Sequence, residues 1–472
     1  MNRKYGSTFW TTRALVAVAL LVTAAIRIAV PFAAFVLTND VQVFHTPDTA
    51  SFVRPAIGLT STWSFAVDGT PEILRTPGYP FFLIPAVASG HLELVAIALQ
   101  VILSVLTAYG VFEIALLVFQ RDDAAILSTA LYAVEPLSVL YTSLLMSEAL
   151  FSFCIVLSLY FFLRYLNDFR WSNLLGSAVA LSASVYVRPV AYLLPLLLST
   201  ILLFWMLVGR DASLKRVMQT FVFFLVCVSL ISAWQFRNYK VAGYAKFSAI
   251  HDYDMYFYAG ASVLAQENRR SLSDQQKLMG LYDWEVYFGQ HPEQRTWNRS
   301  DVYNYMGEEG LKTVARSPLT YLRASAKGPF TTLLGPGLSS YLVLFRCQAS
   351  AQSWGEAAYH ALSGSAFIEV VKKAPAVVWW GNFLLGGMLL AYLLLSLTAL
   401  LSPKREWRNN LIGVAILVMV SAYFIVVPLN TGHSRFREPA MPIICVLAGC
   451  GMATAIAYCQ RLMAALRGKF SK

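Results

Sequence analysis

Apolar runs long enough to cross a lipid bilayer constrain this chain more than any other feature. A helix rises about 1.5 Å per residue, so about 20 apolar residues span a hydrocarbon layer of about 30 Å. The chain of 472 residues is 57% hydrophobic and 13% charged, which excludes an ordinary soluble globule. The ten runs predicted to be spans are Ala14–Leu37, Leu92–Phe119, Ala124–Tyr141, Ala149–Leu166, Leu174–Val187, Ala191–Val208, Val217–Trp234, Ala376–Leu401, Leu411–Val427 and Ala440–Tyr458. The sequence therefore predicts an all-α polytopic membrane protein.

Basic residues gather in the connections on one face of these predicted spans. They are Arg3, Lys4, Arg13, Arg121, Arg164, Arg170, Arg210, Lys215, Arg216, Lys404, Arg405, Arg408, Arg461, Arg467, Lys469 and Lys472. Cytoplasmic loops of membrane proteins carry an excess of Lys and Arg, so both termini are expected in the cytoplasm. Topology and anionic lipid explain much of the net charge of +11, and nucleic acid binding is not supported.

Long segments connect the spans on the opposite, outer face. The first is residues 38–90, the second is residues 235–374, and a short charged one is Asn430–Glu438. The predicted division of the chain is a membrane module (1–234) containing the first outer loop, an extracytoplasmic soluble and interfacial segment (235–374), and a C-terminal membrane module (375–472). Because long structured loops on a rigid scaffold commonly carry function, we expect the chemistry outside the membrane.

The second outer segment contains its own helical signals. A Ser-Asp-Gln-Gln sequence indicates a helix from about Ser273 towards Phe288, and a second helix is predicted from Ser300 to Arg316. The stretch Glu356–Lys373 is predicted to lie flat on the bilayer as an amphipathic piece.

An isolated aspartate and an arginine-proline motif stand out in the first outer loop. Asp48 precedes the sequence Arg75-Thr76-Pro77-Gly78-Tyr79-Pro80. The prolines cannot sit inside a helix, so the apolar helix after them must begin at a fixed place, with Arg75 and Tyr79 at the membrane surface. Asp48 has two interpretations, which can both hold. It can cap a helix after Pro47, or it can take a proton from a nucleophilic hydroxyl as a general base.

Several arginines map to the outer interface, where they can bind phosphate. They are Arg75, Arg237, Arg435 and Arg437, with Arg188 added if it ends its span. Guanidinium groups offer several fixed donors to phosphate oxygens, although each can instead snorkel from the end of a span. His433 lies beside the last two arginines and is a supporting candidate.

Carboxylates at the start of apolar sequence are a further signal. Glu148 opens a span, and Glu135 lies near the outer end of the preceding one. A carboxylate in the membrane is costly unless it is paired, so each should face a cavity or an arginine. For Glu148 the structural alternative is a pair with Arg188 or Arg27.

A short polar stretch in the second outer segment is a weak candidate for metal binding. His251, Asp252 and Asp254 offer imidazole and carboxylate ligands that suit a divalent metal ion. A polar loop explains the same residues equally well. A divalent ion is therefore a candidate cofactor, and no cofactor is assigned.

Taken in order, these motifs resemble those of a known group of enzymes. They are Asp48 with Phe52, Arg75 to Pro80, Glu135-Pro136, Ser147 to Phe151, Arg188-Pro189, Trp234 to Tyr239, and Gly432 to Pro439. The series resembles the GT-C membrane glycosyltransferases, and within them glycosyltransferase family 39, which includes protein O-mannosyltransferases and lipid A aminoarabinose transferases.

The resemblance implies a GT-C-like bundle of about ten transmembrane helices with extracytoplasmic loop helices and a small outer domain. It also implies inverting transfer of a hexose or pentose from a polyprenyl-phosphate donor to an envelope lipid, polysaccharide or protein, with Asp48 as general base. The expected location is the bacterial inner membrane, with the site facing the periplasm or exterior.

A transporter or flippase of lipid-linked sugars is the alternative function. Transporters place charged or Gly/Pro-broken segments at mid-membrane in paired halves. Here the polar residues gather at the outer ends of the predicted spans, which favours the transferase.

Overall fold

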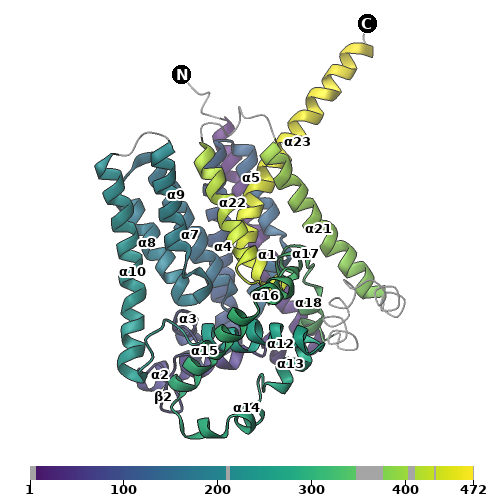
Figure 1. Ribbon diagram of the computed structural model, residues 1–472. Helices are drawn as coiled ribbons and strands as arrows, with labels where there is room; N and C mark the ends of the chain where they lie inside the picture. Colours follow the sequence, from purple (N-terminus) through teal and green to yellow (C-terminus); the bar gives the residue numbers. More distant parts are fainter. Residues whose placement is uncertain (1–6, 209–212, 347–375, 402–409, 430–431, 471–472) are drawn as a thin grey trace.

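The computed structural model describes residues 7–208, 213–346, 376–401, 410–429 and 432–470 (Figure 1). About 83% of these residues are helical. A two-residue antiparallel β-pair joins β1 (Ala66–Val67) to β2 (Thr70–Pro71) inside the first outer loop. The predicted class, an all-α polytopic membrane protein, is confirmed.

Every predicted apolar run carries a helix. These helices are α1 (Ser7–Thr38), α4 (Leu92–Phe119), α5 (Asp122–Ala133), α6 (Pro136–Ser143), α7 (Glu148–Asp168), α8 (Trp171–Val187), α9 (Leu194–Val208), α10 (Leu214–Ala242), α21 (Ala376–Leu401), α22 (Leu411–Val426) and α23 (Met441–Phe470). In the described part of the chain, seven helices are long and apolar enough to cross a membrane, or eight if α5 and α6 form one bent span. The remaining two predicted spans, α8 and α22, are only 17 and 16 residues long.

The predicted third span, Ala124–Tyr141, is not one continuous helix. It bends by 48° between α5 and α6. Pro136 has no N–H group and cannot continue a helix hydrogen-bond ladder, so α6 starts there. The guanidinium of buried Arg27 in α1 donates to the carbonyls of Tyr132 (3.1 Å) and Ala133 (2.9 Å) at the break. Arg27 therefore satisfies backbone groups and does not pair with the carboxylate suggested by the sequence.

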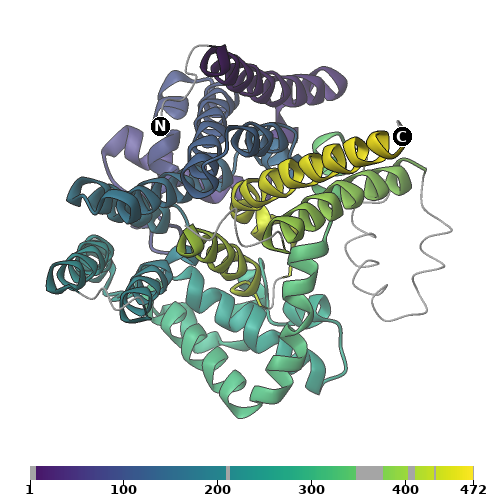
Figure 2. The same ribbon diagram turned by 90° about the horizontal axis from the view of Figure 1, so that it is seen from above.

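Close contacts between helices depend on glycines in α23. A Cβ atom on Gly449 would collide with Ser128 in α5, and one on Gly451 would collide with the carbonyl group of Leu395 in α21. Small residues at such contacts let helix backbones approach closely within a membrane. Figure 2 shows α21 and α23 lying side by side.

Shorter helices gather at one end of the bundle. They are η1 (Val41–Phe44), α2 (Thr49–Thr62), α3 (Gly78–Ser89), η2 (Pro189–Ala191), α11 (Ile250–Asp254), the π-helix η3 (Met255–Gly260), α12 (Ala261–Glu267), α13 (Leu272–Leu278), α14 (Trp284–Gln290), η4 (Pro292–Thr296), α15 (Arg299–Arg316), α16 (Pro318–Ser325), α17 (Lys327–Leu334), α18 (Leu338–Leu344) and η6 (Ser434–Ala440). The start of α1 and the end of α23 lie at the opposite end (Figure 1).

The outer segment agrees with the sequence in one helix and differs in another. The predicted helix from Ser300 to Arg316 is α15, which Asn298 caps by accepting the Asp301 N–H. The single helix predicted from about Ser273 towards Phe288 starts close to the expected place but is divided into two, α13, which Ser271 caps, and α14. Gly280 separates the two with a φ of +86°, which ordinary side chains rarely adopt.

Some predictions fall outside the described residues. They concern the amphipathic stretch Glu356–Lys373 and the basic residues Arg3, Lys4, Arg210, Lys404, Arg405, Arg408 and Lys472.

Candidate active site

Asp48 occupies the cap position of α2 but does not cap it. Its side chain makes no capping hydrogen bond. The neighbouring Thr49 holds this turn, since its Oγ1 accepts the Thr46 N–H (2.8 Å) and donates to the Leu145 carbonyl (3.1 Å). The carboxylate of Asp48 is therefore free for other partners.

Two carboxylates and three guanidinium groups meet at the outer end of the bundle. Asp48 accepts hydrogen bonds from Arg75 Nη2 and Arg435 Nη1, both at 2.7 Å. Glu148, fully buried, accepts from Arg435 Nε and Arg188 Nη1. We call Arg75, Arg188 and Arg435 the arginine cluster. Its three positive charges exceed the two negative ones, which leaves one net positive charge at the site.

The arginine cluster controls the protonation of Asp48. Burial raises the pKa of the Asp48 carboxyl, but Arg75 and Arg435 outweigh it and lower the pKa to about 2. Charge-assisted hydrogen bonds favour the ionised form in this way. Asp48 is therefore a carboxylate throughout the physiological range.

Local packing fixes the arginine-proline motif against the end of α8. Thr76 Oγ1 donates to the Val187 carbonyl at 2.9 Å. A Cβ on Gly78 would lie only 2.8 Å from backbone atoms of Tyr186, so no larger residue fits without movement. This contact brings the motif beside Arg188, which directly follows α8. The predicted start of the apolar helix after both prolines is wrong, because α3 begins at Gly78 and holds Pro80 in its first turn, where a missing N–H costs no helix hydrogen bond.

Tyr79 and His433, the supporting candidates, have partners of their own. Tyr79 is completely buried and donates to Gln100 Oε1 at 2.7 Å, so its predicted position at the membrane surface is wrong. His433 Nδ1 accepts the backbone N–H of Arg435 at 3.0 Å and caps η6. His433 thus orders the turn that presents Arg435 to the cluster.

The structure does not bring Arg237 and Arg437 into the arginine cluster. Arg237 donates to the carbonyls of Glu72 (2.9 Å) and Phe65 (2.8 Å), which fastens α10 to the first outer loop. Arg437 is buried and donates to two carbonyls near the end of α17. Both guanidinium groups hold backbone, a use that their sequence position alone does not reveal.

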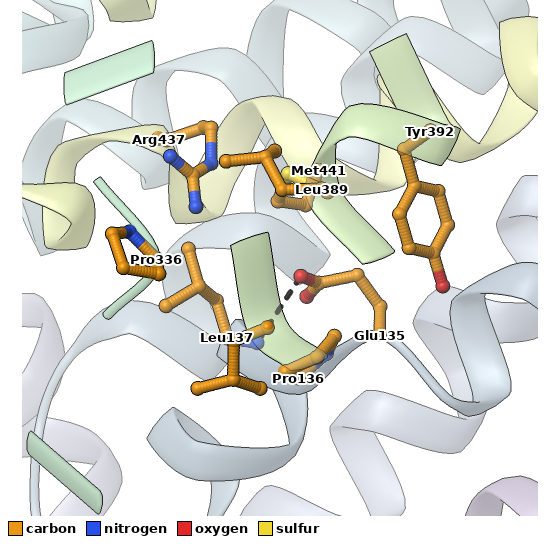
Figure 3. A pocket seen from close by; sticks show the side chains of 9 residues that line it. Glu135, Pro136, Leu137, Pro336, Leu389, Tyr392, Arg437 and Met441 are labelled. Atoms are coloured by element: carbon orange, nitrogen blue, oxygen red, sulfur yellow. Dashed lines mark hydrogen bonds between the residues drawn. The ribbon is translucent and has the colours of Figure 1, made fainter. Parts of the chain in front are cut away.

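Glu135 and Arg437 line a small separate pocket between α6, α21 and α23. Figure 3 shows Glu135 and Arg437 on its walls with Tyr392 and Pro336. The Glu135 carboxylate caps α6 by accepting the Leu137 N–H at 3.1 Å, drawn as the dashed line. Glu135 therefore shares a pocket with an arginine, as expected of a carboxylate beside apolar sequence.

The three metal candidates do not converge on one point. Asp252 is buried and accepts from Lys246 Nζ (2.8 Å) and Tyr244 Oη (2.6 Å). His251 and Asp254 instead line a cavity. Over the described parts of the chain, no group of three His, Cys, Asp or Glu residues is arranged to hold a metal ion. The predicted set does not form a metal site.

A cavity of about 630 Å³ opens beside the arginine cluster. All three cluster arginines contribute to its lining. Apolar and aromatic side chains from the start of the α9 region and the end of α22 line another part, namely Val190, Tyr192, Leu193, Tyr423, Val427, Pro428 and Leu429. The cavity is thus cationic at one place and apolar where the spans border it.

Residues 76–234 match the protein family described as dolichyl-phosphate-mannose-protein mannosyltransferase. This third of the chain contains Glu148 and Arg188 of the candidate site. No curated protein matches the sequence.

Solved structures share the fold at low sequence identity. The apo oligosaccharyltransferase of Archaeoglobus fulgidus matches with 13% identity and a TM-score of 0.55, covering 99% of this chain and 53% of its own. The archaeal oligosaccharyltransferase AglB from Archaeoglobus fulgidus, in complex with an inhibitory peptide and a dolichol-phosphate, matches with 12% identity and a TM-score of 0.52, covering 99% and 52%. ArnT from Cupriavidus metallidurans bound to undecaprenyl phosphate has 14% identity, coverage of 95% and 78%, and a TM-score of 0.41.

The family match and the oligosaccharyltransferase structures agree on one class of protein. The chain is a multi-pass helical membrane protein with a GT-C-like fold, and it spans about half the length of the oligosaccharyltransferase that it matches. The predicted resemblance to the GT-C membrane glycosyltransferases is confirmed.

Proposed function

We propose that this protein transfers a sugar, a hexose or pentose, from a polyprenyl-phosphate donor to an extracytoplasmic acceptor: an envelope lipid, a polysaccharide or a protein. The observation that carries the proposal is the cavity, which joins a cluster of three arginines to an apolar wall formed by membrane spans. A polyprenyl phosphate has the same two parts, an anionic head and an apolar tail.

The arginine cluster suits a phosphate because it has donors to spare. A guanidinium carries five N–H groups. Arg75 and Arg188 each use one group toward a carboxylate, and Arg435 uses two. The remaining N–H groups can bind phosphate oxygens and stabilise the charge that develops on the leaving phosphate.

The apolar wall suits a prenyl chain that enters from the bilayer. Burial of apolar surface contributes about 25 cal/mol per Å², so a long chain held along α9 and α22 adds affinity without hydrogen bonds. The presence of a dolichol-phosphate in one of the matching oligosaccharyltransferase structures supports a donor of this chemistry.

Asp48 is the proposed general base of an inverting displacement. The acceptor oxygen attacks the anomeric carbon, the bond from that carbon to the phosphate oxygen breaks, and the electron pair leaves with the phosphate. The acceptor proton goes to Asp48. Before the donor binds, Asp48 forms ion pairs with Arg75 and Arg435. A donor phosphate that binds these two guanidinium groups weakens the ion pairs, and this raises the proton affinity of Asp48.

We propose that the site faces the periplasm or exterior of a bacterial inner membrane and that both termini are cytoplasmic. The excess of basic residues in the loops at the other end of the bundle supports this orientation. The transporter alternative receives less support. A transporter of this kind has two broken spans, one in each half of the chain. The described residues contain one broken span, α5 with α6.

Replacement of Arg435 by Lys tests the proposal. Lys keeps the charge but cannot bridge two anions with a planar fork, so we expect binding of undecaprenyl phosphate to weaken by about 10-fold or more. The matched control is Arg323→Lys, an exposed arginine of α16. The product is identified by mass spectrometry of envelope lipids and glycans from cells with and without the protein.

If Arg435→Lys and Arg188→Lys both bound undecaprenyl phosphate as tightly as wild type, the arginine cluster would be excluded as the phosphate site. Identical envelope lipids and glycans in cells with and without the protein would contradict the transferase function.

A further inference from the structure

Asp254 is a carboxylate that faces the cavity and has no hydrogen-bond or ion-pair partner among the described residues. Of the described residues that line the cavity it is the one acidic side chain. It ends α11 at the junction with η3 and makes no capping hydrogen bond. Asp254 is half-buried, and a carboxylate inside a cavity that no described side chain pairs is available to bind a ligand there.

The helix itself separates Asp254 from its neighbouring aspartate. Successive residues of a helix are about 100° apart, so Asp252 and Asp254 point about 200° apart. Asp252 faces the outer domain, where Lys246 and Tyr244 occupy its oxygens. Asp254 faces the cavity, and although Lys246 also lines that cavity, no described side chain forms a hydrogen bond or ion pair with the Asp254 carboxylate. The structure thus neutralises one aspartate and leaves the other open to a ligand.

Tight packing holds this aspartate in place. A Cβ on Gly310 of α15 would collide with the Met255 carbonyl, and one on Gly260 would lie 3.3 Å from the Cα of Gly310. The residues from Met255 to Gly260 form a π-helix that begins directly after Asp254. Short π-helical turns occur frequently at functional sites, where they re-aim side chains. Asp254 therefore lies on a rigid wall and not on a loose loop.

Asp254 lies within electrostatic reach of the arginine cluster without bonding to it. Burial raises the pKa of Asp254 to about 7, Arg75 opposes this shift, and Asp48 adds to it. If a donor phosphate binds Arg75, the group attached to that phosphate occupies the cavity next to it. A second phosphate would be repelled by Asp254, whereas a ligand rich in O–H donors would be attracted.

We propose that Asp254 binds hydroxyl groups of the sugar that is transferred, and so helps to select that sugar. The inference rests on the proposed function. The two oxygens of a carboxylate can accept from two neighbouring hydroxyls of a sugar ring, and Tyr258, also in the lining, offers an aromatic face nearby. Asp254 is then a specificity-determining residue, distinct in role from the general base Asp48.

The test compares ligands with and without the sugar. Undecaprenyl phosphate and its mannose, glucose and arabinose derivatives are titrated separately against the full-length protein in detergent. For wild type and for Asp254→Asn and Asp254→Ala, the affinity for each sugar derivative is divided by that for undecaprenyl phosphate. We expect this ratio to fall by about 10- to 100-fold in the variants for at least one sugar, while undecaprenyl phosphate itself binds unchanged.

Two comparisons separate the outcomes. Glu308→Gln, which removes an exposed carboxylate from α15, should leave the ratio unchanged. Arg435→Lys should weaken all ligands together. The thermal stability of Asp254→Asn should equal or exceed that of wild type, because an unpartnered carboxylate is removed.

A ratio that is the same in wild type and in both Asp254 variants overturns the inference and leaves the proposed function intact. If the Asp254 variants melt at a lower temperature than wild type and lose affinity for all ligands in parallel, the inference is also overturned. Asp254 would then stabilise the fold. Failure of wild type to bind undecaprenyl phosphate would remove the proposed function and this inference with it.

Discussion

At the scale of single residues, the site depends on which carboxylates have partners. Asp48 is held by two guanidinium groups, and Glu148 by two as well, so Arg435 links both acids. Such a network keeps the arginines ordered in the unliganded protein. Under the proposed function, an incoming phosphate would compete with Asp48 for the same donors, and donor binding would then be coupled to the proposed base.

Asp48→Asn tests the proposed base. The amide keeps the shape of the side chain but cannot take a proton, so we expect turnover to fall by about 10² to 10⁴ while undecaprenyl phosphate still binds. Product formation is measured with purified protein. The control is Asp68→Asn in the same loop, whose side chain is 78% exposed. Turnover of Asp48→Asn at the wild-type rate would eliminate Asp48 as the base, and loss of folded protein would indicate a structural role.

The pH dependence of stability should report the same carboxylate. The folded-state pKa of Asp48 is about 2, below its ordinary value of 3.8. Its contribution is therefore complete above pH 3.8 and is lost as the pH falls toward 2. Thermal melts of wild type between about pH 6 and 2 should show a loss below about pH 4 that is smaller in Asp48→Asn, which lacks this one titrating carboxyl. Equal acid sensitivity of the two proteins would argue against the ion pairs.

At the scale of elements, the break between α5 and α6 depends on Arg27. Its guanidinium supplies the donors that Tyr132 and Ala133 lose when Pro136 starts a new helix. Arg27→Met should deprive the Ala133 carbonyl of its Arg27 donor, at about 1–3 kcal/mol, whereas the Tyr132 carbonyl keeps the Glu135 N–H at 3.2 Å. We expect a lower melting temperature in detergent, with Arg323→Met as the exposed control. An unchanged melting temperature would show that the break is stabilised by other contacts.

The sequence predicts elements better than it predicts the uses of their side chains. Apolar length predicted a helix at each of the ten runs, but in the described residues only seven are long enough to span a membrane unbroken, or eight with the bent pair α5 and α6. Glu135-Pro136 marks the break in the third span, because Pro136 starts α6. The apolar run alone predicts a continuous helix through this pair. The sequence does not show which hydrogen-bond partner a polar side chain will find. It therefore could not predict that Tyr79 donates to Gln100, or that Arg237 and Arg437 donate to backbone carbonyls.

The charge cluster itself was predictable only in part. Asp48, Arg75, Glu148, Arg188 and Arg435 were each singled out, yet their pairing joins residues up to 387 positions apart. Neither composition nor periodicity reports such contacts. Asp254 was noted only as a metal ligand, and its isolation in the cavity follows from the helix turn that directs Asp252 the other way.

At the scale of the whole molecule, orientation in the membrane determines whether the site faces the compartment of the proposed acceptor. The basic loops predict that a reporter fused after Lys472, or within 402–410, reports the cytoplasm, and that one near Asn268 reports the outer compartment. Paired alkaline phosphatase and fluorescent protein fusions measure this. An outer location for Lys472 would invert the bundle and place the cavity on the wrong side.

The last outer turn, η6, supplies Arg435, and this sets an order of events during synthesis. Asp48, Arg75, Glu148 and Arg188 all emerge from the ribosome more than 240 residues earlier, by the numbering of the chain. Until the C-terminal spans are inserted, Asp48 and Glu148 each lack one of their two guanidinium partners. Synthesis through η6 is therefore needed before the charge network can form, and a chain that ends before Arg435 leaves Asp48 and Glu148 with one guanidinium partner each.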